Sequence, residues 1–366
     1  MKKKSRLVVE ALENRWCPAL TATLNTGVLT VSGTADNGSI AIVQDSSTAG
    51  KISVSDGAVA VSGSPFSGVN TIRLVLTAAD DHVRVNLGGQ KLAGNIFAHL
   101  GDGANDLKVK NGAIGGALSV SAGLGDDSVT LGDGTTALTI KDVSLGLDGG
   151  IDTVNVNSGV TVTRFFSTTY ANNVTLAAGS TTDYVFIRGG SAGNTINLNG
   201  DVTGSVSIDS YFCFGSSAGT TVNINGEVDG NVGFLGSNMP DTFNVAGNIG
   251  KSVYAATLGG NDSISITGAV TANLVLDAGS GDDVMSLNNV VGGQAFVFGG
   301  AGNDSLTIGA SAHFLSTAVV SMGAGNDSVT LNDSAQFTTL LINGGTGTDT
   351  FNGNPNRPGL TLISFP

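Results

Sequence analysis

A Gly-rich turn followed by an acidic residue and an alternating apolar run recurs four times between Leu258 and Leu331. The copies read LGGNDSISI, AGSGDDVMSL, GGAGNDSLTI and GAGNDSVTL. Successive acidic positions are 21, 21 and 23 residues apart, at Asp262, Asp283, Asp304 and Asp327. A fixed period of this size is the signature of stacked repeats. It constrains the fold strongly, because a solenoid grows by adding coils and not by enlarging one core.

Each period has room for two or three short strands and shows no helical pattern. In the copy that begins at Asp283, we predict strands over Val284–Leu287 and Gln294–Phe298, with turns between them. Strands of identical phase can stack on their copies one coil away, about 4.8 Å along the axis. The sequence therefore predicts an all-β fold, a parallel β-helix of 21–23-residue coils, for which we expect a right-handed winding. Some 13–15 coils would form a rod of roughly 60–70 Å.

The same phase can be followed over most of the chain. The positions that open each second run are predicted to be Asp81, Asp106, Asp127, Asp152, Asp183, Asn194, Thr220, Asp241 and, after the regular set, Asp349. Two irregular steps in the middle predict a distorted coil or an insertion near Phe165–Asn173. We therefore divide the chain into an export-like segment (1–19), a β-helix (20–353) and a C-terminal cap or tail (354–366), whose prolines would blunt an open strand edge.

Charge and composition exclude several functions. The formal net charge is −13, which argues against a nucleic-acid partner, because phosphate binding requires a basic surface. Between Gly189 and Asn356 there are 13 acidic residues and one basic residue, Lys251, so this half should attract cations. No run approaches the ~18 apolar residues of a membrane span. The two cysteines show no metal or disulfide spacing, and we expect Cys213 to be buried in an apolar run.

The Gly-Asp turns resemble the RTX, or hemolysin-type, calcium-binding nonapeptide GGxGxDxUx. Gly299–Thr307 and Gly344–Asn352 match it fully, and Ala122–Thr130, Ala278–Ser286 and Met322–Thr330 match except for the first Gly. The resemblance implies Ca²⁺ in an all-oxygen cage of carboxylates and turn carbonyls. The residues it assigns to the metal are Asp127, Asp283, Asp304, Asp327 and Asp349, with weaker assignments to Asp106, Asp152 and Asp262 in degenerate copies.

The spacing of the nonapeptides departs from the RTX pattern. In RTX rolls they follow one another in tandem, whereas here about a dozen other residues follow each copy, so at most one edge of the β-helix could hold ions. Carboxylates about 5 Å apart repel by roughly 3 kcal/mol per neighbour at an effective dielectric near 20, which favours a cation. The alternative is that each Asp caps a turn by accepting hydrogen bonds from backbone N–H groups. Asn194 and Thr220 could do this without an ion.

The N-terminal stretch Leu7–Ala19, LVVEALENRWCPA, resembles the LEPR-XLL motif at the start of large bacterial repeat proteins that are thought to be exported. The resemblance implies an extracellular or cell-surface location. Val8, Leu12 and Trp16 also have the spacing of a short amphipathic helix. The apolar run is too short for a standard secretory signal.

Nothing in the sequence indicates catalysis. P-loop and HExxH motifs are absent, the only Trp is Trp16, and the basic residues of the repeat region are scattered singly. We therefore expect a non-catalytic, exported protein of structural or adhesion type, possible partners being calcium and a cell-surface or matrix polysaccharide or protein. One alternative is a polysaccharide-binding or polysaccharide-cleaving β-helix, which requires clustered aromatics or an Asp/Arg/Lys constellation on one face. Another is an intracellular structural repeat protein.

Overall fold

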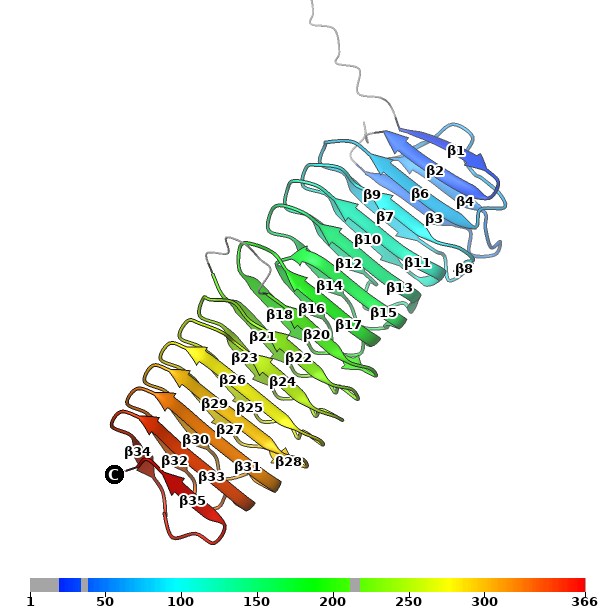
Figure 1. The fold of residues 1–366 in the computed structure, drawn as a ribbon. Helices are drawn as coiled ribbons and strands as arrows, with labels where there is room; N and C mark the ends of the chain where they lie inside the picture. Colours follow the sequence, from blue (N-terminus) through cyan, green and yellow to red (C-terminus); the bar gives the residue numbers. More distant parts are fainter. Residues whose placement is uncertain (1–19, 34–38, 211–217, 366) are drawn as a thin grey trace, which may run out of the picture.

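The computed structural model is an elongated β-solenoid of about 13 turns, with coils of about 22 residues and 58% of the chain in strands (Figure 1). It describes residues 20–33, 39–210 and 218–365. The predicted fold class is confirmed: these residues form no helix, and their strands stack as parallel sheets. The predicted N-terminal helix and the environment of Cys213 lie outside the described residues.

Each coil contributes strands to two long sheets, which we call sheet I and sheet II. Sheet I contains β1 (Thr21–Asn25), β2 (Val28–Gly33), β6 (Thr71–Leu76), β8 (Lys91–Leu92), β9 (Ile96–His99), β11 (Gly112–Ala122), β13 (Leu138–Leu147), β15 (Val160–Ala171), β17 (Thr181–Gly189), β19 (Asp201–Val202), β20 (Val206–Asp209), β22 (Val232–Leu235), β24 (Val253–Ala256), β26 (Leu274–Ser280), β28 (Val290–Val291), β29 (Ala295–Ala301), β31 (His313–Ala324), β33 (Gln336–Thr346) and β35 (Leu360–Ile363).

Sheet II contains β3 (Ile40–Gln44), β4 (Ile52–Asp56), β5 (Val59–Ala60), β7 (His82–Asn86), β10 (Asp106–Lys110), β12 (Ser128–Leu131), β14 (Thr153–Val156), β16 (Asn173–Leu176), β18 (Asn194–Leu198), β21 (Thr220–Ile224), β23 (Thr242–Val245), β25 (Ser263–Ile266), β27 (Val284–Leu287), β30 (Ser305–Ile308), β32 (Ser328–Leu331) and β34 (Thr350–Asn352).

Equivalent residues of successive coils face one another in parallel register. In sheet II, for example, Phe243 pairs with Ile264, and Ile264 pairs with Met285. The N-terminal end differs, because β1 pairs with β2, and β3 with β4, in antiparallel fashion. Alternating apolar patterns identified these strands from the sequence but did not reveal their direction.

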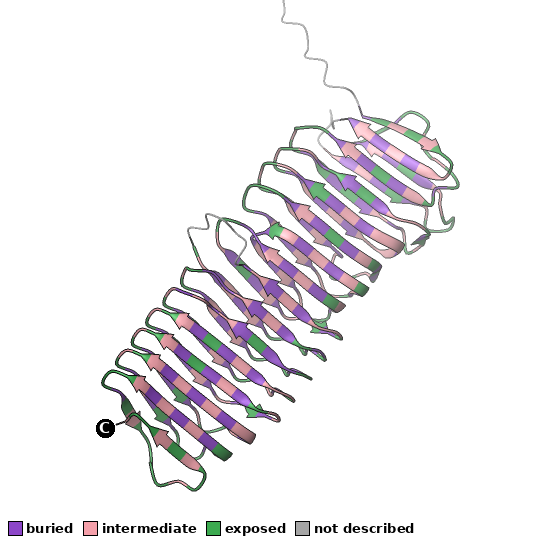
Figure 2. Cartoon of the chain, viewed as in Figure 1, coloured by how far each residue is buried: buried purple, intermediate pink, exposed green. Residues whose placement is uncertain are grey.

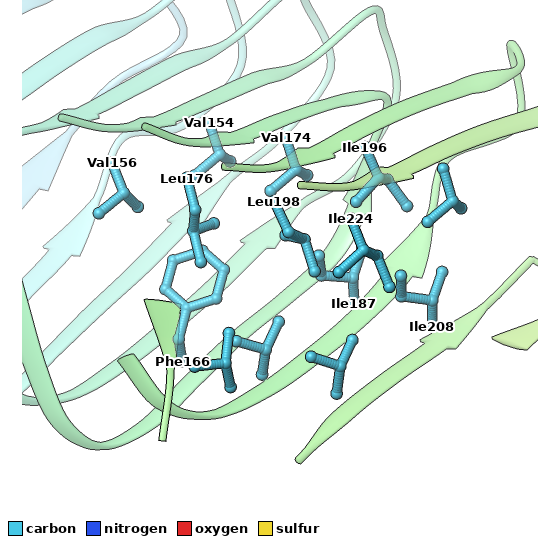
Figure 3. Packing of buried hydrophobic residues seen from close by; sticks show 14 of the residues in the cluster. Val154, Val156, Phe166, Val174, Leu176, Ile187, Ile196, Leu198, Ile208 and Ile224 are labelled. Atoms are coloured by element: carbon cyan, nitrogen blue, oxygen red, sulfur yellow. The ribbon is translucent and has the colours of Figure 1, made fainter. Parts of the chain in front are cut away.

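The core lies between the two sheets along the whole rod. Residues alternate along each strand between buried and more exposed, as period-2 patterning requires (Figure 2). In the middle of the rod, Leu176 and Leu198 of sheet II face Phe166, Ile187 and Ile208 of sheet I (Figure 3). All five side chains have at most 1% of their surface exposed. Because each coil buries only its own short strands, the core repeats one coil at a time.

The middle of the rod is distorted as predicted, but not by an insertion near Phe165–Asn173. This segment belongs to β15 and β16, which pair with strands on each side, and the register of β15 shifts between Val162 and Phe165 and between Thr169 and Ala171. At the C-terminal end, β35 pairs in parallel with β33, and the inward-facing Leu360 and Leu362 remain only half-buried because no further described strand covers them.

Candidate functional site

One column of polar side chains runs inside the Gly-Asp edge of the rod, with one residue in each coil. We call it the inner column. Every member has 5% or less of its surface exposed. Its members are Asp81, Asn105, Asp127, Asp152, Asn172, Asn194, Thr220, Asp241, Asp262, Asp283, Asp304, Asp327 and Asp349.

The carboxylates of the inner column accept hydrogen bonds from backbone N–H groups of the neighbouring coil. Asp304 Oδ1 accepts a hydrogen bond from the N–H of Asp283 at 3.0 Å, and Asp327 Oδ1 accepts one from the N–H of Asp304 at 2.8 Å. In the same way, Asp283 Oδ1 accepts from the N–H of Asp262, and Asp349 Oδ1 accepts from the N–H of Asp327. Each of these Asp side chains therefore caps a turn amide of the preceding coil.

Two predicted members of the phase were wrong. Asn105, not Asp106, occupies the inner column, and Asn172 takes the place predicted for Asp183. Asp106 instead begins β10 half-exposed, and Asp183 lies in β17 of sheet I. The prediction followed acidic residues, whereas the turn amide needs only a side-chain oxygen, which Asn supplies equally well.

A second set of side chains, the outer column, lies on the exposed side of the same turns, one residue before the inner column. Asp282 Oδ1 accepts from the N–H of Asn303 at 2.7 Å, and Asn303 Oδ1 accepts from the N–H of Asn326 at 2.9 Å. Asn326 continues the series to Thr348. These contacts run to the following coil, in the opposite axial direction to those of the inner column. The sequence analysis missed this column, although the recurring Asn or Asp before the motif Asp was a visible signal.

The two columns supply hydrogen-bond acceptors for backbone amides of the Gly-rich turns. Gly300 and Gly302 have φ values of +114° and +139°, a region that other residues rarely adopt. The following amides, at Asn303 and Asp304, then face opposite neighbours along the rod axis. Buried backbone amides must find an acceptor. Side-chain oxygens of the two adjacent coils supply it.

Burial makes the inner carboxylates weak acids. Loss of solvation raises the pKa of Asp304 to about 6 and that of Asp262 to about 7, although the amide hydrogen bond opposes each shift. Asp152 behaves alike, with a pKa of about 6. Burial also raises the pKa of Asp127, Asp241, Asp283 and Asp327. A protein interior disfavours the charged form unless a partner compensates for it.

In the inner carboxylates, the second oxygen, Oδ2, is the atom that no hydrogen bond stabilises. Oδ2 has no hydrogen-bond partner among the described residues and is inaccessible to solvent in Asp127, Asp152, Asp283, Asp304, Asp327 and Asp349. A polar atom buried without a partner is rare and calls for an explanation, such as a proton or an ion.

The two full nonapeptides differ from the others next to this oxygen. A Cβ placed on Gly299 would lie 2.6 Å from Asp304 Oδ2 and 2.5 Å from the carbonyl oxygen of Met322. At Gly344 the same point lies 2.5 Å from Asp349 Oδ2 and 2.7 Å from the Ser364 carbonyl oxygen. Carboxylate and carbonyl oxygens thus approach each of these glycines so closely that a Cβ would clash with both. They are the donor types that Ca²⁺ takes. The chemistry of these two turns fits calcium.

The partly matching copies carry a side chain at that point. Ala122, Ala278 and Met322 stand where Gly299 and Gly344 stand, beside Asp127, Asp283 and Asp327 respectively. The sequence placed these three Asp on a par with Asp304 and Asp349. The structure gives all five the same buried, amide-capping position, but at only two of them is the facing residue a glycine with no room for a Cβ.

Within the described ranges, no three His, Cys, Asp or Glu side chains are grouped so that they could hold a metal ion. Calcium at this edge would therefore depend on backbone carbonyls for most of its ligands. The residues that the structure describes also contain no helix of the length and apolarity needed to cross a bilayer. Comparison with known proteins found no matching family model, no matching curated protein and no matching solved structure.

Proposed function

We propose that this protein is a non-catalytic structural rod of the cell surface or extracellular matrix. The observation that supports the proposal is the continuity of the coils: in-register pairing runs through sheet II from β7 to β34. From Asn261 to Thr348, the two polar columns link each coil by hydrogen bonds to both of its neighbours. At ~4.8 Å per coil, about 13 turns span roughly 60 Å. Such a rod can hold a binding partner or a second domain at a fixed distance.

The surface location rests on the N-terminal resemblance and on the acidic composition. It is tested by cell fractionation combined with N-terminal sequencing of the mature chain. Export predicts recovery outside the cytoplasm. Recovery of the full-length chain in the cytosol alone would favour the intracellular structural alternative.

We also propose that Ca²⁺ binds the Gly-Asp edge and stabilises the rod, first at Asp304 and Asp349. The support is the convergence of Oδ2 and a carbonyl oxygen beside Gly299 and Gly344. A bound cation would remove the penalty for holding a deprotonated carboxylate in the interior. Asp127, Asp283 and Asp327 would follow with lower affinity, because Ala or Met stands where the oxygens approach Gly299 and Gly344. Asp106 is not included, since it lies outside the inner column.

Isothermal calorimetry with CaCl₂ on the EDTA-treated protein tests this proposal. Binding heat and a higher melting temperature are expected with Ca²⁺ and should be reduced in the variant Gly299→Ala, whose Cβ would displace Asp304 Oδ2 and the Met322 carbonyl oxygen. The matched variant is Gly233→Ala, because Gly233, like Gly299, lies outside the positive-φ region and its added Cβ would meet no atom closer than 3.9 Å. If millimolar Ca²⁺ gives neither heat nor a shift in melting temperature, the inner carboxylates serve only as caps.

A further inference from the structure

A basic groove lies on the outer face of sheet II near the N-terminal end of the rod, where β3, β7 and β10 are neighbours (Figure 1). Its volume is about 400 Å³. Parallel register places Ala41, Arg84 and Lys108 in one row across the three strands. The next row consists of Val43, Asn86 and Lys110. The groove therefore has an apolar side on β3 and a cationic side on β7 and β10.

The cations of the groove differ in how they are paired. Arg84 forms an ion pair with Asp106, and Lys110 Nζ lies 3.1 Å from Asp133 Oδ2. Asp133 is strongly anionic, because the N–H groups of Thr135 and Thr136 hold the pKa of its carboxyl well below the usual range. Lys108 has no ion-pair partner in the described part of the chain. Lys108 therefore lines the groove half-buried and, among the described residues, has no carboxylate paired with it, so its ammonium can accept an anionic ligand.

The groove opens onto a long polar face. The row that contains Arg84 and Lys108 continues in register through Thr130, Asn155, Thr175, Asn197, Asn223 and Asn244. The Asn side chains are ordered, because Asn223 Nδ2 donates to Asn197 Oδ1 and Asn244 Nδ2 donates to Asn223 Oδ1, each at 2.9 Å. This face presents hydroxyl and amide groups once per coil, about 4.8 Å apart.

We propose that this face binds an acidic polysaccharide, with a sugar carboxylate held by Lys108 in the groove, beside the Arg84–Asp106 ion pair. The neighbouring sugars would lie along the Thr and Asn row, whose hydroxyl and amide groups match sugar hydroxyls as hydrogen-bond partners. A neutral glycan would leave Lys108 without a counter-charge, and the six residues of the two rows provide no aromatic ring for stacking. The proposal gives a partner class to the surface role proposed above, but binding in solution does not depend on where the cell places the protein.

The test uses the full chain and oligogalacturonate of about ten sugars, measured by calorimetry at low salt. The matched ligand is the same oligomer with its carboxylates methyl-esterified. Wild-type protein should bind the acid form at least tenfold more tightly, since one charge-assisted contact corresponds to about a factor of ten. Equal binding of both forms, or no binding of either, would overturn the proposal.

Two variants locate the site. Lys108→Gln should weaken oligogalacturonate binding about tenfold while leaving the melting temperature unchanged, because the side chain points outward from β10. Lys141→Gln removes an exposed Lys from β13 of sheet I and should leave affinity unchanged. Equal losses in both variants would show a non-specific charge effect and refute the site. Inorganic phosphate is the third arm: if it displaces the oligomer at the same concentration as monomeric galacturonate does, the groove is a simple anion site and the glycan proposal fails. None of these outcomes bears on Ca²⁺ at the Gly-Asp edge.

Discussion

Replacing Asp304 separates the capping role of the inner column from a metal-binding role. In Asp304→Ala, the N–H of Asp283 loses its acceptor at 3.0 Å in a site where Asp304 itself is only 1% exposed. A buried donor left without a partner costs about 1–3 kcal/mol. Locally, this corresponds to a loss of about 5- to 150-fold in hydrogen-exchange protection of the Asp283 amide.

Asp304→Asn should behave differently, because Asn keeps the accepting oxygen and removes the charge. The chain already contains this arrangement: Asn105 Oδ1 accepts from the N–H of Asp81, and Asn172 Oδ1 accepts from the N–H of Asp152, both at 3.2 Å. In EDTA at pH 8, Asp304→Asn should therefore be at least as stable as wild type. Its Asp283 amide should stay protected.

Hydrogen exchange is the appropriate assay, because long repeat arrays need not unfold in a two-state manner. Asp282→Asn is the control, since Asp282 is the exposed neighbour in the outer column and the amide oxygen preserves its contact with Asn303. Equal protection of the Asp283 amide in Asp304→Ala and wild type would refute the capping argument. With Ca²⁺ present, Asp304→Asn should lose metal stabilisation that Asp282→Asn retains, if calcium occupies this turn.

Two further predictions concern the pH dependence of the melting temperature and the effect on stability of replacing turn glycines. In EDTA, the melting temperature should be higher at pH 5.5 than at pH 8: burial raises the pKa of Asp262 from 3.8 to about 7, so the folded chain binds more protons than the unfolded chain above about pH 4, and stability falls as the pH rises to about 7. Asp262→Asn should reduce this dependence, although the other buried carboxylates retain part of it, and a melting temperature that rises with pH would contradict the prediction. Gly302→Ala should destabilise the rod by several kcal/mol in chemical denaturation, because its Cβ would lie 1.9 Å from the Gly281 carbonyl oxygen at a positive φ. Gly134→Ala, with the same sign of φ but open space, should cost only about 1–2 kcal/mol; similar losses in the two variants would argue against the clash.

The repeat period was sufficient to predict the fold class and many strands. Val284–Leu287 is β27 as predicted, and the predicted strand at Gln294–Phe298 overlaps β29, which extends into the turn as far as Ala301. A 21-residue step combined with period-2 alternation leaves few arrangements other than stacked parallel strands. Strand direction at the N-terminal end was not predictable, because alternation is the same in parallel and antiparallel pairs.

The basic groove could not be predicted from the sequence, because it depends on the register between neighbouring strands. Arg84 and Lys108 are 24 residues apart and seemed to be isolated charges, yet parallel pairing of β7 and β10 places them side by side. The step between these coils could not be fixed from acidic residues, because Asn105 holds the column position and Asp106 is one residue out of phase. One residue of error moves every side chain of a strand to the opposite face.

Most positions of the inner column hold Asp, although Asn can cap the same turn amide. Asn105 and Asn172 show that an amide oxygen caps the turn without any charge. A carboxylate makes the same contact with Oδ1 but buries a second oxygen and raises the pKa of Asp304 to about 6. Capping alone therefore does not account for the Asp residues from Asp241 to Asp349, because Asn would cap at lower electrostatic cost. A proton at acidic pH or a cation at neutral pH relieves that cost.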